Sequence, residues 1–256
     1  MNLPSPLDLS GRTALITGST RGLGASAARC LAGLGATVAI NGRDPAVVAQ
    51  RCREIEASGG KALEAAFDVT DRAAIADAVA GIAATRGGLD ILVASAAFYL
   101  TKPVEQTSDD ELESLFATKF SSAFVAVRCA IPHMKARGWG RIVLVSSIGV
   151  IASGGRAPAD AAASGALATL AKAVSTSLAP HGITCNAVAP GFIDTEMTQR
   201  YRDEPGNAAW IAGRVPAGRW GRPDEIGWPI AFLSTEAASF ITGHTLIVDG
   251  GITSSY

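Results

Sequence analysis

Residues 13–34 read TALITGSTRGLGASAARCLAGL and contain a short apolar run, a glycine-rich turn and a helical pattern in direct succession. The run Thr13–Thr17 has the length and apolar character of a buried strand. The turn places Gly18, Gly22 and Gly24 between that strand and the residues that open the helix. A strand, a tight turn and a helix in this order form the first half of a β-α-β unit, so the segment predicts a parallel α/β sheet.

The rest of the chain repeats this alternation. Further strands are expected at Thr37–Ile40, Ala62–Phe67, Ile91–Ala94, Ile142–Ser146, Ile183–Val188 and Thr245–Val248. Helices are expected near Gly22–Leu34, Pro45–Ser58, Arg72–Thr85, Asp109–Arg137, Ala159–Leu178 and Pro223–Leu233. Because most strands are apolar on both faces, helices should cover both sides of the sheet. The pattern predicts one doubly wound α/β domain over residues 1–256, with a mobile excursion at about 191–222 that is rich in Gly, Pro, Arg and Trp.

Composition narrows the class of protein. Hydrophobic residues make up 48% of the chain, which is enough for a large core, and the net charge of −1 gives no footprint for nucleic acid or an acidic membrane. The four cysteines are far apart and lack CxxC spacing, and no signal peptide or membrane span is expected, which predicts a soluble cytoplasmic protein with reduced thiols. The three histidines share no metal-ligand spacing, so no metal site is predicted.

The glycine-rich turn is a candidate site for a dinucleotide. Glycines let the backbone approach a pyrophosphate closely, and the start of the helix offers free N–H groups and the positive end of its dipole. The expected contacts are Gly18, Ser19, Arg21, Gly22, Leu23 and Gly24. A turn of this kind can also be only a tight β-α connection, but its place after the first strand favours nucleotide binding.

Two arginines indicate which dinucleotide is bound. Arg43 follows the second strand, at or one residue beyond the position where NAD-binding proteins place an acid, and Arg21 lies in the glycine turn. Cations there accommodate a 2′-phosphate, which favours NADP(H) over NAD(H). The alternative is that Arg43 is a solvated surface residue. Asp68 and Val69, after the third strand, are expected to border the adenine, or Asp68 caps the next helix.

Several ordered motifs resemble those of the short-chain dehydrogenase/reductase family. They are the TGxxxGxG turn at Thr17–Gly24, LDILV at residues 89–93, IVLVSS at residues 142–147, NAVAPGFIDT at residues 186–195, GRPDEI at residues 221–226 and VDGG at residues 248–251. The resemblance runs from about Leu9 to Ile252. It implies a seven-stranded sheet in the order 3-2-1-4-5-6-7, NADP(H) across the carboxyl ends of the strands, and a homo-oligomer, either tetramer or dimer. It also implies that the nicotinamide contacts Pro190, Gly191, Ile193 and Thr195.

The chain departs from the family pattern at the catalytic positions. Of the four positions, only Ser147 is retained. Asp160 stands where the family carries a tyrosine, Ser164 where it carries a lysine, and Lys119 where it carries an asparagine. The family motif NNAG is here Ala94–Ala97.

These departures leave several roles open. A tyrosine protonates the developing alkoxide in the family, whereas Asp160 is shorter and normally ionised. Lys119 either pairs with Asp160 only to stabilise the pocket, or it replaces the missing lysine's charge or donates a proton. Tyr99 offers a replacement phenol or is an aromatic wall of the pocket. Three tryptophans either line a substrate site or anchor the excursion to the body: Trp210, Trp220 and Trp228.

Three functions are compatible with this sequence. The first, and the favoured one, is an NADP(H)-dependent oxidoreductase that acts on a small carbonyl or alcohol substrate with a non-standard proton relay. The second is a catalytically silent cofactor-binding protein that acts as a sensor or oligomer partner. The third is a non-redox enzyme that uses Asp160 as a general base. The intact segment Pro190–Thr195 on the nicotinamide side favours the first function over the third.

Overall fold

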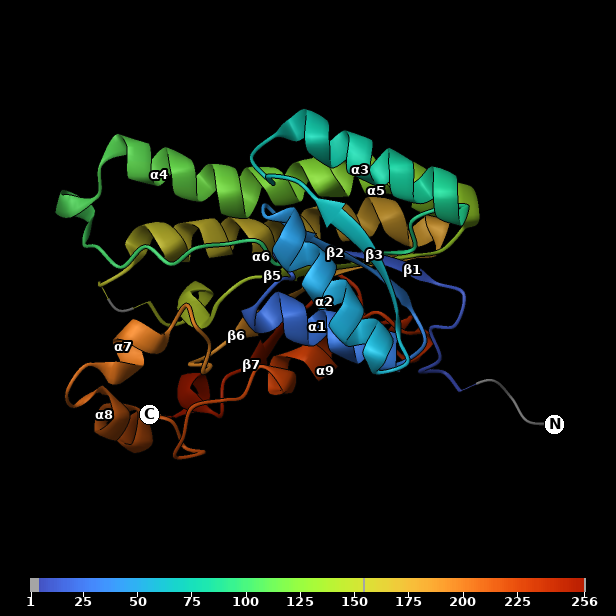
Figure 1. Cartoon of the computed structure of the whole chain (residues 1–256). Coiled ribbons are helices and arrows are strands. Elements are labelled where there is room, and N and C mark those ends of the chain that lie inside the picture. Colours follow the sequence, from blue (N-terminus) through green and yellow to red (C-terminus); the bar gives the residue numbers. More distant parts are fainter. Residues whose placement is uncertain (1–4, 154, 256) are drawn as a thin grey trace.

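The computed structural model describes residues 5–153 and 155–255, and these form a seven-stranded parallel sheet (Figure 1). The strands are β1 (Thr13–Thr17), β2 (Thr37–Gly42), β3 (Lys61–Ala66), β4 (Ile91–Ala94), β5 (Gly140–Val145), β6 (Ile183–Pro190) and β7 (Thr245–Val248). Their order is β3-β2-β1-β4-β5-β6-β7, and every neighbouring pair is parallel, which confirms the predicted sheet. The first four residues of the predicted domain lie outside the described part.

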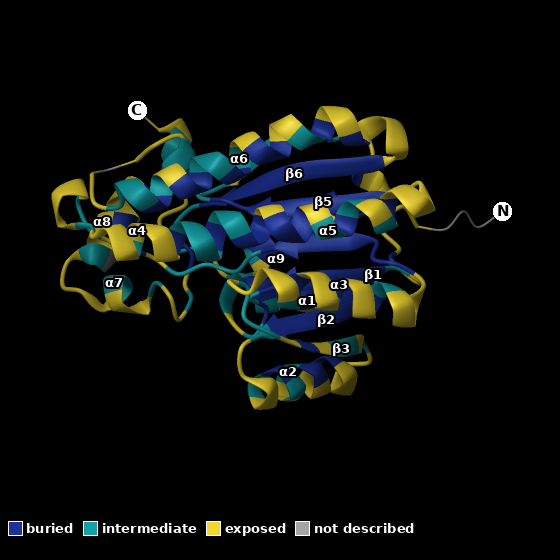
Figure 2. Ribbon diagram, turned by 90° about the horizontal axis from the view of Figure 1, so that it is seen from above, coloured by how far each residue is buried: buried dark blue, intermediate teal, exposed yellow. Residues whose placement is uncertain are grey.

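Helices cover both faces of the sheet, as the apolar strands predict. The main ones are α1 (Gly22–Gly33), α2 (Pro45–Ala57), α3 (Arg72–Arg86), α4 (Asp109–Phe116), α5 (Ser122–Arg137), α6 (Pro158–Leu178) and α9 (Asp224–Leu233). In Figure 1, α3, α5 and α6 lie above the sheet and α1 and α9 below it. Each side has its own apolar core against the strands. The central strands are fully buried, whereas the edge strand β3 is partly exposed (Figure 2). The other edge strand, β7, is partly exposed as well.

Two helix starts follow the capping rules. The Ser108 side chain accepts a hydrogen bond from the Glu111 backbone N–H, and the Glu111 carboxylate accepts one from the Ser108 backbone N–H, so α4 begins with a capping box. Asp44 accepts hydrogen bonds from the backbone N–H groups of Ala46 and Val47, and Pro45 occupies the first turn of α2. Both starts lie where the sequence predicts them.

The helix expected over Asp109–Arg137 is present along its whole length, but it is not a regular α-helix throughout. A π-helical turn, Ala117–Ser121, separates α4 from α5. A π turn inserts an extra residue into the helical repeat, so it shifts the side chains that follow relative to those before it. Lys119 lies in this turn and is buried. Because of the π turn, Lys119 lies on a different face of the helix from the one that it would occupy in a regular α-helix. Nothing in the local sequence marks the π turn.

The same stretch is also long and apolar enough to cross a membrane by length and composition alone, with a mean hydropathy of 1.3 over an 18-residue segment. This differs from the expectation that nothing in the chain approaches a membrane span. Within the protein the stretch is divided by the π turn, and α5 packs against α3 and the core on that side of the sheet. The core helix of a globular protein can have the same length and composition, and 44% of the 18-residue segment is buried.

The excursion between β6 and α9 contains two short helices that the sequence does not predict, α7 (Gln199–Asp203) and α8 (Asn207–Arg214). Its aromatic residues pack together. The centroid of the Phe192 ring lies 5.6 Å from that of Trp210 and 5.7 Å from that of Trp220, and both pairs are edge to face. The Phe192 ring also stacks on Tyr201, with 6.2 Å between the centroids. Such pairs stabilise the excursion beyond the area that they bury.

Candidate active site

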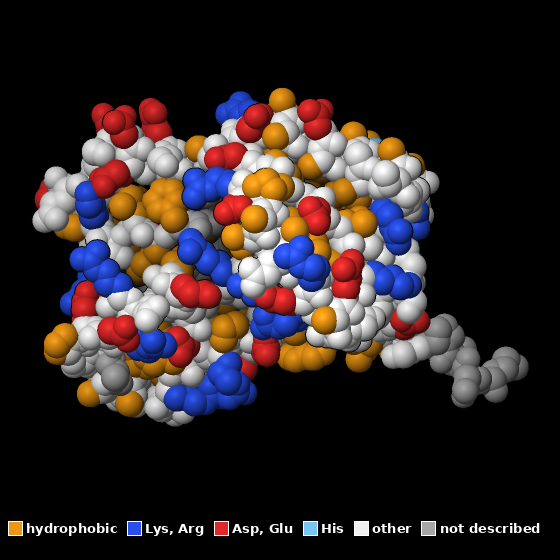
Figure 3. All heavy atoms as spheres, viewed as in Figure 1, with side chains coloured by type: hydrophobic (Ala, Val, Ile, Leu, Met, Phe, Trp, Pro, Cys, Tyr) orange, Lys and Arg blue, Asp and Glu red, His pale blue; other side chains and the backbone are white. Residues whose placement is uncertain are grey.

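A cleft of about 1580 Å³ lies at the carboxyl ends of the strands. In Figure 3 a hollow runs between the α4 end of the molecule and the α7–α8 segment, with Lys and Arg side chains beside hydrophobic ones. Twelve of the residues predicted to hold the nucleotide line the cleft: Gly18, Arg21, Gly22, Leu23, Gly24, Arg43, Asp68, Val69, Pro190, Gly191, Ile193 and Thr195. The four predicted catalytic residues line it as well: Tyr99, Lys119, Ser147 and Asp160.

The glycine turn leaves no room for side chains at two positions. Gly18 has φ +65°, and a Cβ atom there would lie 2.8 Å from the Cα of Ala96. A Cβ on Gly24 would lie 2.4 Å from the carbonyl oxygen of Gly18. Helix α1 then begins without a side-chain cap or an acidic residue in its first turn. The free N–H groups of that turn are left to bind an anion at the cleft.

Ser19 is the exception among the predicted nucleotide contacts, because it is turned into the protein. Its hydroxyl donates to the carbonyl of Ile16 at 2.7 Å and accepts from the N–H of Asn41 at 2.8 Å. Its own N–H donates to the carbonyl of Asn41. The Asn41 side chain in turn accepts from the N–H of Gly18 and donates to the carbonyls of Ala65 and Phe67. Ser19 and Asn41 thus hold the glycine turn against β2 and β3.

The end of the cleft near β2 is positively charged. Arg21 and Arg43 are both exposed, and neither forms an ion pair within residues 5–153 and 155–255. Asp68 accepts two hydrogen bonds from Thr70, and these, with the nearby Arg43, hold the pKa of its carboxyl below the usual value. Asp71, not Asp68, caps α3. The glycine cradle and the two unpaired guanidinium groups fit a dinucleotide that carries a 2′-phosphate.

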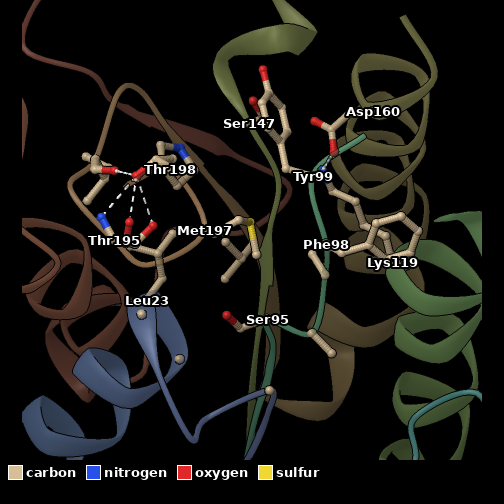
Figure 4. A pocket seen from close by; sticks show the side chains of 18 of the residues that line it. Leu23, Ser95, Phe98, Tyr99, Lys119, Ser147, Asp160, Thr195, Met197 and Thr198 are labelled. Carbon is tan, nitrogen blue, oxygen red and sulfur yellow. Dashed lines mark hydrogen bonds and ion pairs between the residues drawn. The ribbon is translucent and has the colours of Figure 1, made fainter. Parts of the chain in front are cut away.

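The opposite wall of the cleft holds a buried ion pair (Figure 4). The Nζ of Lys119 lies 2.8 Å from Oδ1 of Asp160 and 2.8 Å from Oγ of Ser164. Lys119 and Asp160 are each 6% exposed, and Ser164 is fully buried. The three residues come from the π turn and from the first two turns of α6. The structure joins these three residues in one hydrogen-bonded cluster.

Ser147 and Tyr99 lie beside this cluster. Ser147 follows β5, and its Oγ accepts a hydrogen bond from the N–H of Gly149 at 3.2 Å, which leaves its proton available. In Figure 4 the Tyr99 ring projects between Ser147 and Asp160. Tyr99 is 45% exposed. Partial burial of the ring and the charge of Asp160 raise the pKa of its phenol, so the hydroxyl stays protonated at neutral pH.

Other residues at the cleft are not apparent from the sequence. The hydroxyl of Thr198 accepts from the N–H of Thr195 at 3.0 Å and donates to the carbonyl of Ile193 at 2.6 Å, which fixes the segment expected beside the nicotinamide (Figure 4). Trp210 and Trp220 line the cleft, whereas Trp228 does not and lies on α9. Long-range packing brings several further side chains here: Arg51, Phe98, Arg156, Met197, Tyr201 and Arg214.

Known proteins resemble the chain over nearly its whole length. A family model described as enoyl-(acyl carrier protein) reductase matches residues 18–253. Gluconate 5-dehydrogenase from Gluconobacter oxydans is 40% identical over 256 residues, all of both chains. A 2-dehydro-3-deoxy-D-gluconate 5-dehydrogenase from Pseudoalteromonas atlantica is 35% identical and covers 95% of this chain and 96% of its own length.

A solved structure shows the same similarity in three dimensions. The gluconate 5-dehydrogenase from Burkholderia cenocepacia, in complex with NADP and tartrate, is 35% identical and covers 98% of both chains with a TM-score of 0.95. Relatives with bound NADP confirm the class of cofactor that Arg21 and Arg43 predict. The ordered motifs, the sheet topology and these relatives agree, and the chain belongs to the short-chain dehydrogenase/reductase family of oxidoreductases.

Proposed function

We propose that this protein is an NADP(H)-dependent oxidoreductase that interconverts a secondary alcohol and a carbonyl on a small polar substrate, with a non-standard proton relay. The observation that carries the proposal is the single cleft that joins the glycine turn and the two arginines to the wall with Ser147 and Asp160. A hydride-transfer enzyme needs its cofactor site and its proton-transfer groups in one cavity.

The cofactor would be held by residues spread along one side of the cleft. The glycine turn faces the pyrophosphate, Arg21 and Arg43 face the 2′-phosphate, Asp68 and Val69 border the adenine, and Pro190–Thr195 borders the nicotinamide. When bound, NADP(H) supplies or accepts the hydride. The protein must then orient the substrate oxygen and move one proton.

Four side chains are proposed to serve that oxygen: Ser147, Asp160, Lys119 and Tyr99. The hydroxyl of Ser147 has a free proton and is suited to orient a carbonyl. The Lys119–Asp160 pair is proposed to take the place of the phenol and ammonium of the family pattern, with its positive charge on the π turn instead of on α6. Tyr99 is proposed as an aromatic wall that also offers a hydroxyl to the substrate.

The substrate is proposed to be a small hydroxy acid or its keto form. Relatives that cover almost the whole chain act on gluconate derivatives by name, and one was solved with tartrate. Exposed guanidinium groups on two sides of the cleft, Arg156 and Arg214, suit a carboxylate. Arg214 also lies 5.7 Å from the ring of Trp210.

The test combines nucleotide binding with turnover. NADPH and NADH are titrated by fluorescence, and the absorbance of the reduced nicotinamide is followed with gluconate, tartrate and a panel of ketones, quinones and secondary alcohols. We expect tighter binding of NADPH and turnover of a hydroxy acid or keto acid. Tight NADPH binding without any turnover would instead support a catalytically silent binder, and no binding of either nucleotide would leave a non-redox enzyme with Asp160 as base.

The choice of nucleotide is tested at Arg43. The substitution Arg43→Asp removes one charged contact to the 2′-phosphate and adds repulsion, so we expect the KM for NADPH to rise by roughly tenfold to hundredfold. The KM for NADH should stay within about threefold, because NADH has no phosphate there. Steady-state kinetics with both nucleotides measure the change, and Arg53→Asp, on α2 but outside the cleft, is the matched control. Equal losses for both nucleotides would place Arg43 away from the 2′-phosphate.

Assembly and location are part of the same proposal. Large apolar side chains are exposed on α9, on the edge strand β7 and on α5, at Trp228, Phe232, Ile247 and Phe124. Such surfaces are typical of subunit interfaces. We propose a cytoplasmic homo-oligomer, a tetramer or a dimer, which light scattering coupled to gel filtration distinguishes from a monomer.

A further inference from the structure

The hydrogen bonds around Lys119 define which groups in the catalytic wall still hold a transferable proton. An ammonium has three N–H donors. Two are used, one toward Oδ1 of Asp160 and one toward Oγ of Ser164, each at 2.8 Å. Within the described residues, no third acceptor lies within hydrogen-bonding distance of the Nζ of Lys119. One N–H therefore remains, on a side chain that lines the cleft.

Ser164 is fixed as an acceptor toward Lys119. Its hydroxyl donates to the main-chain carbonyl of Asp160 at 2.7 Å, one helical turn earlier in α6. A hydroxyl has one proton, so its lone pairs face Nζ. The ion-paired Asp160 also accepts from Nζ, through Oδ1. Both partners thus take hydrogen bonds from Lys119 and give none to it, which fixes the direction of two of its three N–H groups.

Each of the neighbouring groups has a feature that limits it as a proton donor. Asp160 accepts a hydrogen bond from Lys119 through Oδ1 and is engaged in the ion pair. The pKa of Tyr99 is raised by burial and by the charge of Asp160, so its phenol holds the proton more tightly than usual. The Ser147 hydroxyl is a weak acid and is suited to orientation.

We propose that Lys119 is the proton donor to the substrate oxygen, and that Asp160 and Ser164 are positioning residues that aim its third N–H into the cleft. This assignment rests on the proposed oxidoreductase function. In the reduction, the carbonyl carbon receives a hydride with its electron pair, the π electrons move to the oxygen, and the oxygen takes the proton of Lys119. The amine that remains regains a proton from water at the mouth of the cleft, so the net reaction consumes one carbonyl, one hydride and one proton.

Chemical rescue separates proton donation from simple charge. For the natural protein and Lys119→Ala, the reduction of the 5-keto form of gluconate by NADPH is followed with and without added amines. We expect Lys119→Ala to lower kcat by about 100-fold or more, the range of a lost general acid. Ethylammonium and other primary ammonium ions should restore activity in an order that follows their acidity. Guanidinium has the same charge but does not release its proton near neutral pH, so it should not rescue.

A second readout does not depend on turnover. In protein labelled with ¹⁵N-lysine, the signal that Lys119→Ala removes should shift when gluconate is added without nucleotide. Lys102→Ala is the matched control, since Lys102 also forms an ion pair on this side of the molecule, with Glu111, but does not line the cleft. Lys102→Ala should leave kcat and the gluconate-induced shift of the Lys119 signal unchanged.

Specific results would overturn the assignment. Rescue by guanidinium equal to that by ammonium, or full activity in Lys119→Arg, would show that Lys119 supplies only a fixed positive charge and does not donate a proton. If the natural protein binds NADPH but turns over none of the panel, the proposed function fails and the proton-donor role of Lys119 fails with it; a gluconate-induced shift would then show only that Lys119 faces the substrate site. An unshifted Lys119 signal at saturating gluconate would also overturn the assignment.

Discussion

A protein with Asp160→Tyr and Ser164→Lys together should be destabilised and inactive, whereas adding Lys119→Asn to these two changes should yield a folded, active reductase. The double change alone restores the tyrosine and the lysine that the family resemblance places at these positions. In the structure, however, Ser164 is fully buried and its Oγ lies 2.8 Å from the Nζ of Lys119. A lysine at 164 would bring a second ammonium into contact with the first. Two like charges about 4 Å apart repel by about 4 kcal/mol in a partly screened site.

The triple variant removes this conflict, because the asparagine at 119 carries no charge and is shorter. We expect its kcat to lie within about tenfold of that of the natural protein, since one general acid replaces another of similar effect. Thermal unfolding and NADPH-dependent turnover of the double and triple variants measure the difference, with Lys119→Asn alone as control. A double variant as stable and active as the triple one would show that Lys119 does not occupy the site that Ser164 faces.

Much of the fold was predictable because it depends on local patterns. Short apolar runs marked all seven strands, and the helix starts expected at Pro45 and Asp109 are those of α2 and α4. The misses depend on contacts between distant residues. Helices α7 and α8 are stabilised by aromatic packing on Phe192, and no periodic pattern in so short a segment reveals that packing. The π turn at Ala117–Ser121 likewise has no local sequence signal.

The site was predictable to the extent that its residues follow the ends of strands. The nucleotide side is of this kind, apart from Ser19, whose hydroxyl satisfies the backbone within the protein. On the other wall, the sequence raised a Lys119–Asp160 pair as one alternative, and the structure contains it. The sequence did not indicate that Ser164 belongs to the cluster. That role depends on the rotation of Lys119 by the π turn and on the i to i−4 hydrogen bond within α6.

The Lys119–Asp160 pair should also have a large effect on the free energy of unfolding of the protein. Lys119→Met leaves a buried carboxylate without its partner, and Asp160→Leu leaves a buried ammonium, so each change should lower the free energy of unfolding by about 3 kcal/mol. The double variant removes both charges, so its free energy of unfolding should lie within about 1 kcal/mol of that of the natural protein. A small further loss comes from the missing acidic residue in the first turn of α6, where a negative charge stabilises the helix. Urea denaturation of the four proteins completes the double-mutant cycle.

The cycle also bears on why the pair is present. A buried ion pair is weak evidence for stability, because apolar residues of similar volume often replace one without loss. If the double variant is stable and binds NADPH but has lost turnover, stability does not account for the pair, and the pair is present for catalysis. Additive losses from the two single changes would mean that the two charges do not interact in solution. In that case Asp160 would not hold Lys119 in place, and Ser164 would be its only positioning residue among the described residues.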